Sequence, residues 1–230
     1  TAIKESISSI FSAFKNSTSV PSPYTTIVSS RIEQVLSDTS ITLDENLITD
    51  QQSEVSTALG ISVEDMNADY IKEENVVIAK ITQQIEIITN TLSKATSSES
   101  TNVSKDDVMA SLASVITASL DTSSSTFSLS DSSSISNIVS NIETSKSITV
   151  DESVKTNSTS LISDINDNIE TITNDTNDLN TTSFADVIST ATIIKSATNN
   201  IIKDTSIDFS SLNVENIKSD IETEKTNVIL

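Results

Sequence analysis

Apolar residues recur every three or four positions along most of the chain, and the clearest case is the stretch 69–95. At about 100° per residue, six aliphatic side chains of this stretch fall within one arc of a helix. They are Val77, Ile78, Ile81, Ile85, Ile88 and Leu92. Val76 and Ile87 lie outside the arc, as is typical of a helix that contacts neighbours on two sides. The pattern predicts a long central helix over 69–95 in a helical bundle.

The same periodicity predicts shorter helices before this stretch. The first covers 2–14, with apolar positions at Ile3, Ile7, Ile10, Phe11 and Phe14. The only prolines, Pro21 and Pro23, then favour an extended connector, and Pro23 also suits the first turn of a helix. The stripe of that second helix consists of Tyr24, Ile27, Val28, Ile32, Val35 and Leu36.

A third helix is predicted over 51–59, whereas 39–48 is ambiguous between a loop and an extended segment. Gly60, the only glycine, occupies the position after this helix, where positive φ ends a helix. Ser62 and Asp65 have the spacing of a capping pair that opens the next turn.

The polar run 96–102 interrupts the periodicity and is the best candidate for an internal boundary. Ser104 then resembles an N-cap, with Asp106 and Asp107 in the first turn, where the helix dipole favours negative charge. The apolar face of this helix carries Val108, Leu112, Val115 and Ile116. The serine-rich run 121–134 predicts a loop or a flexible link.

Further apolar patterns predict helices throughout the C-terminal half. Their positions are Ile135, Ile138, Val139 and Ile142; Val154, Leu161, Ile162, Ile165, Ile169 and Ile172; Phe184, Val187, Ile188, Ala191, Ile194, Ile201 and Ile202; and Val214, Ile217 and Ile221. Some short runs resemble one another, such as 141–144 and 168–171. In so biased a composition such resemblance arises easily by chance, so we favour chance over internal duplication.

We therefore predict an all-α fold, an elongated multi-helix bundle. An N-terminal helical module at 1–96, which contains the long central helix, is expected to join a C-terminal helical bundle at 104–230 through the Ser/Thr-rich linker. Stacking of the two parts as sub-bundles is a variant of this prediction.

The composition removes most catalytic chemistry. The chain has no His and no Cys, so it lacks the commonest general base, the commonest transition-metal ligand and the thiol nucleophile. No Ser-x-x-Lys stands in a recognisable context, and the carboxylate pairs Asp44/Glu45 and Asp106/Asp107 are adjacent on one element rather than facing across a cleft. We expect no enzyme, and we assign no catalytic, cofactor-binding or metal-binding residue.

The chain is strongly acidic, with 33 acidic against 13 basic residues and a formal net charge of −20. This charge disfavours binding to nucleic acid and to anionic lipid, and the simplest interpretation is a solvated surface. Calcium is the one cofactor left open, since carboxylates suit hard cations. The densest candidate is 174–180, which lacks the glycine and closing glutamate of an EF-hand, so a polar turn is favoured there. Lesser candidates are Asp38, Asp44, Glu45, Asp65 and Asp69.

No apolar run is long enough to span a bilayer, so no membrane span is expected. The chain starts at Thr1 without a signal-peptide pattern, and we expect a mature or excised segment of a longer protein. Exposed Ser and Thr are candidates for O-linked sugars. N-x-Ser/Thr sequons, several of which must arise by chance in this composition, begin at Asn16, Asn102, Asn157, Asn174 and Asn180.

One region resembles a known family. The runs are VPSPYTTI at 20–27, ALGI at 58–61, NADY at 67–70 and QQI at 83–85. Their order is similar to that in the helical modules of very large secreted bacterial surface adhesins, over about residues 20–92. The resemblance implies an extracellular structural role in a fibre or surface layer. The scarcity of glycine and the missing Asp-rich repeats depart from the calcium-binding parts of such adhesins.

The expected function is a non-enzymatic, secreted structural protein of a bacterial cell surface. It would be a self-associating subunit or spacer of a filament, adhesin or surface layer, with subunit contacts at the apolar ends 3–14 and 228–230. The alternative is a soluble helical binding module for a protein or glycan partner, including a host-surface partner.

Overall fold

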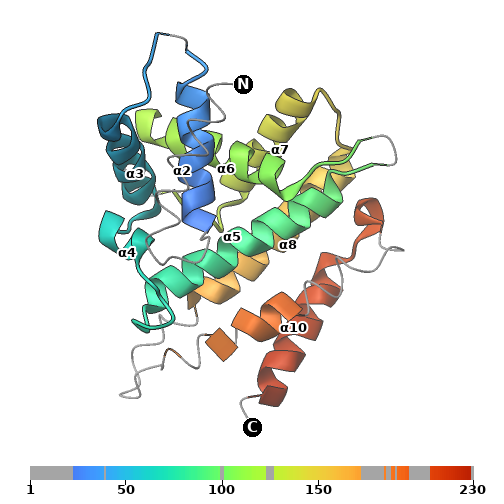
Figure 1. The fold of residues 1–230 in the computed structure, drawn as a ribbon. Helices are drawn as coiled ribbons and strands as arrows, with labels where there is room; N and C mark the ends of the chain where they lie inside the picture. The colour runs from blue at the N-terminus through green and yellow to red at the C-terminus, as the bar shows by residue number, and fades with distance from the viewer. Residues whose placement is uncertain are drawn as a thin grey trace.

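The computed structural model describes residues 23–38, 40–98, 101–122, 127–171, 184, 188–189, 191–196 and 208–228. Within these residues every regular element is helical, which confirms the predicted all-α class (Figure 1). The elements are α2 (Pro23–Val35), α3 (Glu45–Leu59), α4 (Val63–Asn67), α5 (Val76–Ala95), α6 (Lys105–Thr122), α7 (Ser132–Lys146), α8 (Glu152–Thr171), the 3-10 helix η1 (Phe209–Ser211) and α10 (Val214–Val228).

The two longest helices, α5 and α8, lie side by side through the middle of the molecule (Figure 1). Helix α6 contacts α2, α3, α5 and α7, while α7, η1 and α10 pack against α8. Aliphatic side chains from all of these elements form one hydrophobic cluster. Isoleucine dominates its most deeply buried positions, which include Ile27, Ile78, Ile85, Ile87, Ile88, Ile116, Ile135, Ile138 and Ile142.

The central helix is shorter than predicted. It begins at Val76, because the Asn75 side chain caps it by accepting a 3.1 Å hydrogen bond from the Ile78 amide. In the preceding turn, Asp69 accepts hydrogen bonds from two backbone amides, and Glu74 has a left-handed φ of 51°. The prediction was therefore wrong for 69–75. It was also wrong for Val77, which is 55% exposed. The burial of Ile87 agrees with the prediction that a second side of this helix contacts neighbours.

Helix α3 begins six residues before the predicted start. The Asp44 carboxylate accepts a 2.8 Å hydrogen bond from the Leu47 amide, and this cap places part of the ambiguous segment in the helix. At the other end Gly60 has φ 69°, as predicted, and its amide bonds back to the last turn. Ser62 and Ser104 act as N-caps, also as predicted.

The predicted loop 121–134 is shorter than expected, because its ends belong to helices. Asp121 and Thr122 are part of α6, and α7 begins at Ser132 behind the capping carboxylate of Asp131. Between them, Phe127 and Leu129 are buried in the core. The Phe127 amide also donates a 2.7 Å hydrogen bond to the Ala58 carbonyl at the end of α3.

The predicted C-terminal helices are present where the structure describes them. Their buried positions include Ile142 on α7, Ile169 on α8 and Ile221 on α10, and Ile194 is buried in the segment 191–196. The predicted helix over 2–14, the candidate calcium segment 174–180 and the end 229–230 lie outside the described residues, as do Ile172, Val187, Ile201 and Ile202.

The polar break at 96–102 separates α5 from α6, as predicted. On its described flanks it is hydrogen-bonded, since Ser97 Oγ accepts from the Val103 amide at 2.9 Å and Ser93 Oγ donates to the Val103 carbonyl at 2.8 Å. Packing also crosses this boundary, because α6 contacts α2 and α3. The division at 96 and 104 and the stacking of two sub-bundles stay predictions.

Many serine and threonine hydroxyls in these helices donate hydrogen bonds to the backbone of their own helix. A hydroxyl donates to the carbonyl four residues earlier at Ser29, Thr49, Thr89, Thr96, Ser97, Thr117, Ser140, Thr144, Thr156, Ser158, Thr192 and Thr223. This arrangement satisfies hydroxyls even in the core, where Thr89, Thr117 and Ser158 are buried.

Candidate functional site

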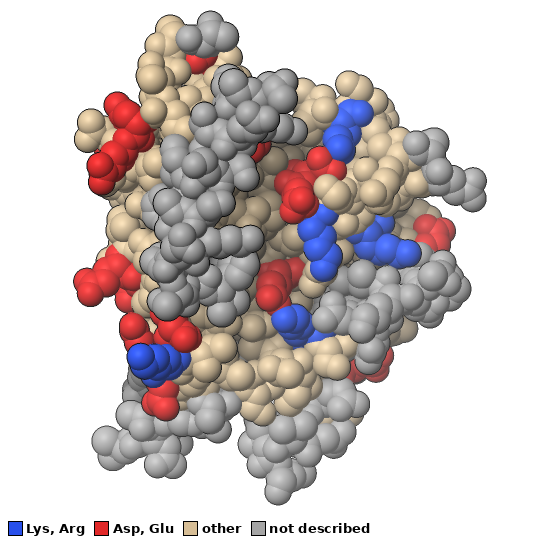
Figure 2. Space-filling model, viewed as in Figure 1, with Lys and Arg blue, Asp and Glu red and all other residues tan. Residues whose placement is uncertain are grey.

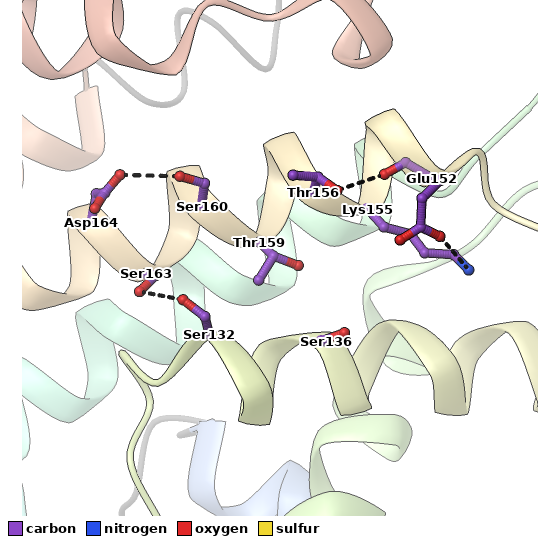
Figure 3. Close-up of a pocket in the computed structure, with 9 residues that line it drawn as sticks. All are labelled: Ser132, Ser136, Glu152, Lys155, Thr156, Thr159, Ser160, Ser163 and Asp164. Carbon is purple, nitrogen blue, oxygen red and sulfur yellow. Dashed lines mark hydrogen bonds and ion pairs between the residues drawn. The ribbon is translucent and has the colours of Figure 1, made fainter.

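A groove lined mainly by hydroxyl groups runs between the N-terminal half of α7 and helix α8 (Figure 3). Its volume is about 320 Å³, near the lower end of the range of small-molecule sites. The lining residues are Ser132 and Ser136 from α7 and Glu152, Lys155, Thr156, Thr159, Ser160, Ser163 and Asp164 from α8. We call it the α7–α8 groove.

Several of these hydroxyls have partners that fix their direction. Ser132 Oγ donates to Ser163 Oγ at 3.0 Å across the two helices, and Ser163 Oγ donates in turn to the Ser130 carbonyl at 2.6 Å (Figure 3). Thr156 bonds to the carbonyl of Glu152, and Ser160 makes a long 3.4 Å bond to Asp164. The chain of serines at one end therefore links α7 to α8 beside the groove.

Thr159 differs from the other lining residues. Its side chain lies on the side of α8 that faces α7 and is 9% exposed, and its hydroxyl oxygen has no hydrogen-bond partner (Figure 3). A buried hydroxyl without a partner costs free energy. Many serine and threonine hydroxyls of this protein donate to the carbonyl four residues earlier, but the Thr159 hydroxyl does not.

The charged groups of the groove are paired. Lys155 lies 3.0 Å from Glu143 and 3.6 Å from Glu152, and Asp164 lies 2.7 Å from Lys218 of α10. The hydrogen bond to Glu143 raises the pKa of Lys155, and the hydrogen bond to Asp164 raises that of Lys218. Both amines stay protonated at neutral pH, so neither is suited to activate a serine as a general base.

Four of the five lesser calcium candidates accept hydrogen bonds within the fold. Asp44 caps α3, Asp38 accepts from the Ser40 amide at 2.9 Å, and Asp65 accepts from Asn75 Nδ2 at 2.9 Å. Asp69 accepts from the two amides of its own turn, and Glu45 is the exposed first residue of α3. Over the part of the chain that the structure describes, no three or more metal-ligating side chains come together.

The second carboxylate pair also has a local role. Asp107 lies 2.8 Å from Lys146 and caps α6 together with Ser104, while Asp106 is exposed. Burial raises the pKa of Asp107, but the hydrogen bonds from Lys146 and Ser104 outweigh it and leave that pKa below its usual range. Of the sequons, Asn102 is exposed, whereas the side-chain Nδ2 of Asn157 donates to the carbonyls of Phe209 and Ser210. The other three lie outside the described residues.

Sequence reasoning missed the α7–α8 groove, although a signal was present. Thr156, Thr159, Ser160 and Ser163 follow the i, i+3, i+4, i+7 spacing of one helix face, so hydroxyls form a stripe along α8 beside its isoleucine stripe. Elsewhere in the chain such residues are so frequent that the stripe does not stand out.

Comparisons with protein-family models, curated proteins and solved structures found no match to this chain. The adhesin-like resemblance of residues 20–92 therefore stays a prediction. Among the helices that the structure describes, none has the length and apolar character needed to cross a membrane.

Proposed function

We propose that this chain is a non-enzymatic structural module of a bacterial cell surface, secreted and acting as a self-associating subunit or spacer of a filament, adhesin or surface layer. The proposal rests on one observation, which is that exposed hydroxyl groups are already hydrogen-bonded within the protein. Exposed serines and threonines such as Ser140, Thr144 and Thr156 already donate to their own helix. Such a surface presents few unsatisfied donors, which suits a module whose outside is chemically inert.

The charge distribution adds to this support. Acidic side chains lie at separate places over the face seen in Figure 2, with a smaller number of basic ones between them. Dispersed negative charge opposes close approach of copies at low ionic strength and is screened as salt rises. We infer that assembly occurs through limited apolar contacts, and we place these at 3–14 and 228–230.

The alternative role, a helical module that binds a protein or glycan, is favoured by the α7–α8 groove. Serine hydrogen bonds link its two walls and its charges are paired, so it is a polar site that is present without a ligand. The two roles are compatible, because the groove is lined by residues between 132 and 164, whereas the proposed subunit contacts are at 3–14 and 228–230.

Sedimentation velocity over a range of protein concentrations tests self-association of the full chain. We expect species larger than a monomer, increasing with protein and salt concentration, and negative-stain images of the concentrated sample should show fibres or sheets. Deletion of residues 2–14 should reduce assembly while the circular dichroism spectrum stays helical. A monomer at all concentrations and salt levels would contradict self-association, and unchanged assembly after the deletion would remove the proposed contact.

A further inference from the structure

We propose that the α7–α8 groove is a binding site for a neutral saccharide, with Thr159 as one of the groups that contact it. This inference deepens the binding role given above as the alternative and rests on that role, but not on self-association. Three observations carry it: the hydroxyl lining, the pairing of every charge and the unpartnered Thr159.

The lining selects for a ligand that both donates and accepts hydrogen bonds. The Ser136 hydroxyl can do both, as can the hydroxyls of a sugar. The Thr156 and Ser160 hydroxyls already donate within α8 and can accept from a ligand. Glu152 and Asp164 add acceptors at separate points along α8, and carboxylate acceptors form the stronger hydrogen bonds. A polyhydroxylated ring matches this set better than an apolar molecule.

The charges select for a neutral ligand. A cation would find Asp164 occupied by Lys218 at 2.7 Å, and it would be repelled by Lys155. An anion would be repelled by Glu152 and Asp164, while Lys155 already lies between Glu143 and Glu152. Neither a metal ion nor a phosphate or sulfate group therefore gains a free counter-charge in the groove.

Thr159 provides the independent sign of a ligand. Its hydroxyl is buried without a partner, and its residue lines the groove. A rotation of about 120° about χ1 moves this hydroxyl to a position that the methyl group or the hydrogen on Cβ held before. A ligand hydroxyl in the groove would satisfy it after that rotation. Since the described lining has no aromatic ring for a sugar to stack on, hydrogen bonds dominate and we expect affinity roughly in the millimolar range.

Amide NMR spectra of the full chain, titrated separately with glucose, N-acetylglucosamine and maltose, test the proposal. At least one sugar should shift amides of residues 132–136 and 152–164 saturably, while sulfate and calcium ions should not shift them. Thr159→Val should weaken binding about 3- to 10-fold, the loss of one hydrogen bond, whereas Thr159→Ser should retain it.

Two tyrosine variants on α7 form a matched pair. Ser136 is exposed and lines the groove, so Ser136→Tyr should fill it and abolish binding. Ser140 is exposed one turn away and does not line it, so Ser140→Tyr should bind sugar like the unmodified chain. Thermal unfolding of each variant checks that it is folded.

No saturable shift with any of the three sugars, shifts on another face, or equal binding by Thr159→Val would overturn the proposal, as would preferential binding of sulfate or calcium. Sedimentation velocity measures self-association separately from sugar binding. Because Ser136→Tyr should assemble like the unmodified chain, loss of the sugar site and loss of the structural role give different results.

Discussion

At the scale of single residues, the fold depends on whether each buried polar group finds a partner. Tyr24 is buried in α2, and its hydroxyl donates to the Ile78 carbonyl at 2.9 Å and lies 3.1 Å from Thr82 Oγ1. Desolvation raises the pKa of this phenol far above its ordinary value, so it stays neutral. Thr91 is fully buried on α5, and its hydroxyl has no partner. Residues of similar burial therefore differ in their contribution to stability.

Replacing these two residues should change stability in different directions. Tyr24→Phe removes the bond that joins α2 to α5 and should lower the free energy of unfolding by about 1 kcal/mol. Thr91→Val removes a buried unpaired hydroxyl at nearly constant volume, so stability should be unchanged or rise by up to ~1 kcal/mol. Urea unfolding followed by circular dichroism measures both. A clear loss in Thr91→Val would show that this hydroxyl has a partner in solution.

At the scale of elements, local capping decides where each helix begins and ends. Gly60 ends α3 with φ 69°, and Ser147 ends α7 with φ 54°. Both amides bond back to carbonyls of the preceding turn, so the two C-terminal caps have the same geometry but different residues. Only glycine adopts this conformation without a steric cost from Cβ.

These two caps should respond oppositely to substitution. Gly60→Ala should lower the free energy of unfolding by about 1 kcal/mol, because alanine is strained at positive φ. Ser147→Gly should raise it by several tenths of a kcal/mol, since relief of strain exceeds the added entropy of the unfolded chain. Thermal unfolding compares both with Ser145→Gly inside the last turn of α7, where glycine should destabilise. Stabilisation by Gly60→Ala would contradict the assigned conformation.

The helices could be predicted because the apolar periodicity that indicates them is local in the sequence. Their exact starts were missed where a capping side chain begins the helix at another residue than the periodicity indicates. The stripe over α5 is visible in the sequence, but the turn at Asp69 and the Asn75 cap remove seven residues from the predicted helix. Pairing of helices was not predictable, because uniform isoleucine stripes do not say which helix faces which. The α7–α8 groove depends on that pairing, since its two walls come from different helices.

At the scale of the whole molecule, side chains from both sides of the predicted linker belong to one hydrophobic cluster. Gln34 on α2 donates to the Ala110 carbonyl at 3.0 Å and to Ser114 Oγ at 2.7 Å on α6. On the other side, Gln84 of α5 donates to the Asn166 carbonyl of α8 at 3.1 Å. Buried and part-buried polar bonds of this kind favour the observed helix pairs, because mispaired helices would leave the groups unsatisfied.

Separating the chain at the predicted linker tests whether these contacts are required. A fragment of residues 1–98 keeps α2, α3 and α5 but lacks α6 and α8, so most of its apolar faces lose their cover. Its Ser- and Thr-rich helices have low intrinsic helicity. We expect weak helical circular dichroism and no cooperative thermal transition, against a cooperative transition for the full chain. Cooperative unfolding of the fragment would support an independent N-terminal module.

The long-range pairing of α2 with α6 and of α5 with α8 also bears on how the polypeptide acquires its shape during synthesis. The bonds from Gln34 to Ser114 and from Gln84 to Asn166 join positions 80 and 82 residues apart. A nascent chain emerging amino end first cannot complete its early pairs until the partner segments arrive. The helices made first would then lack their native partners for much of translation.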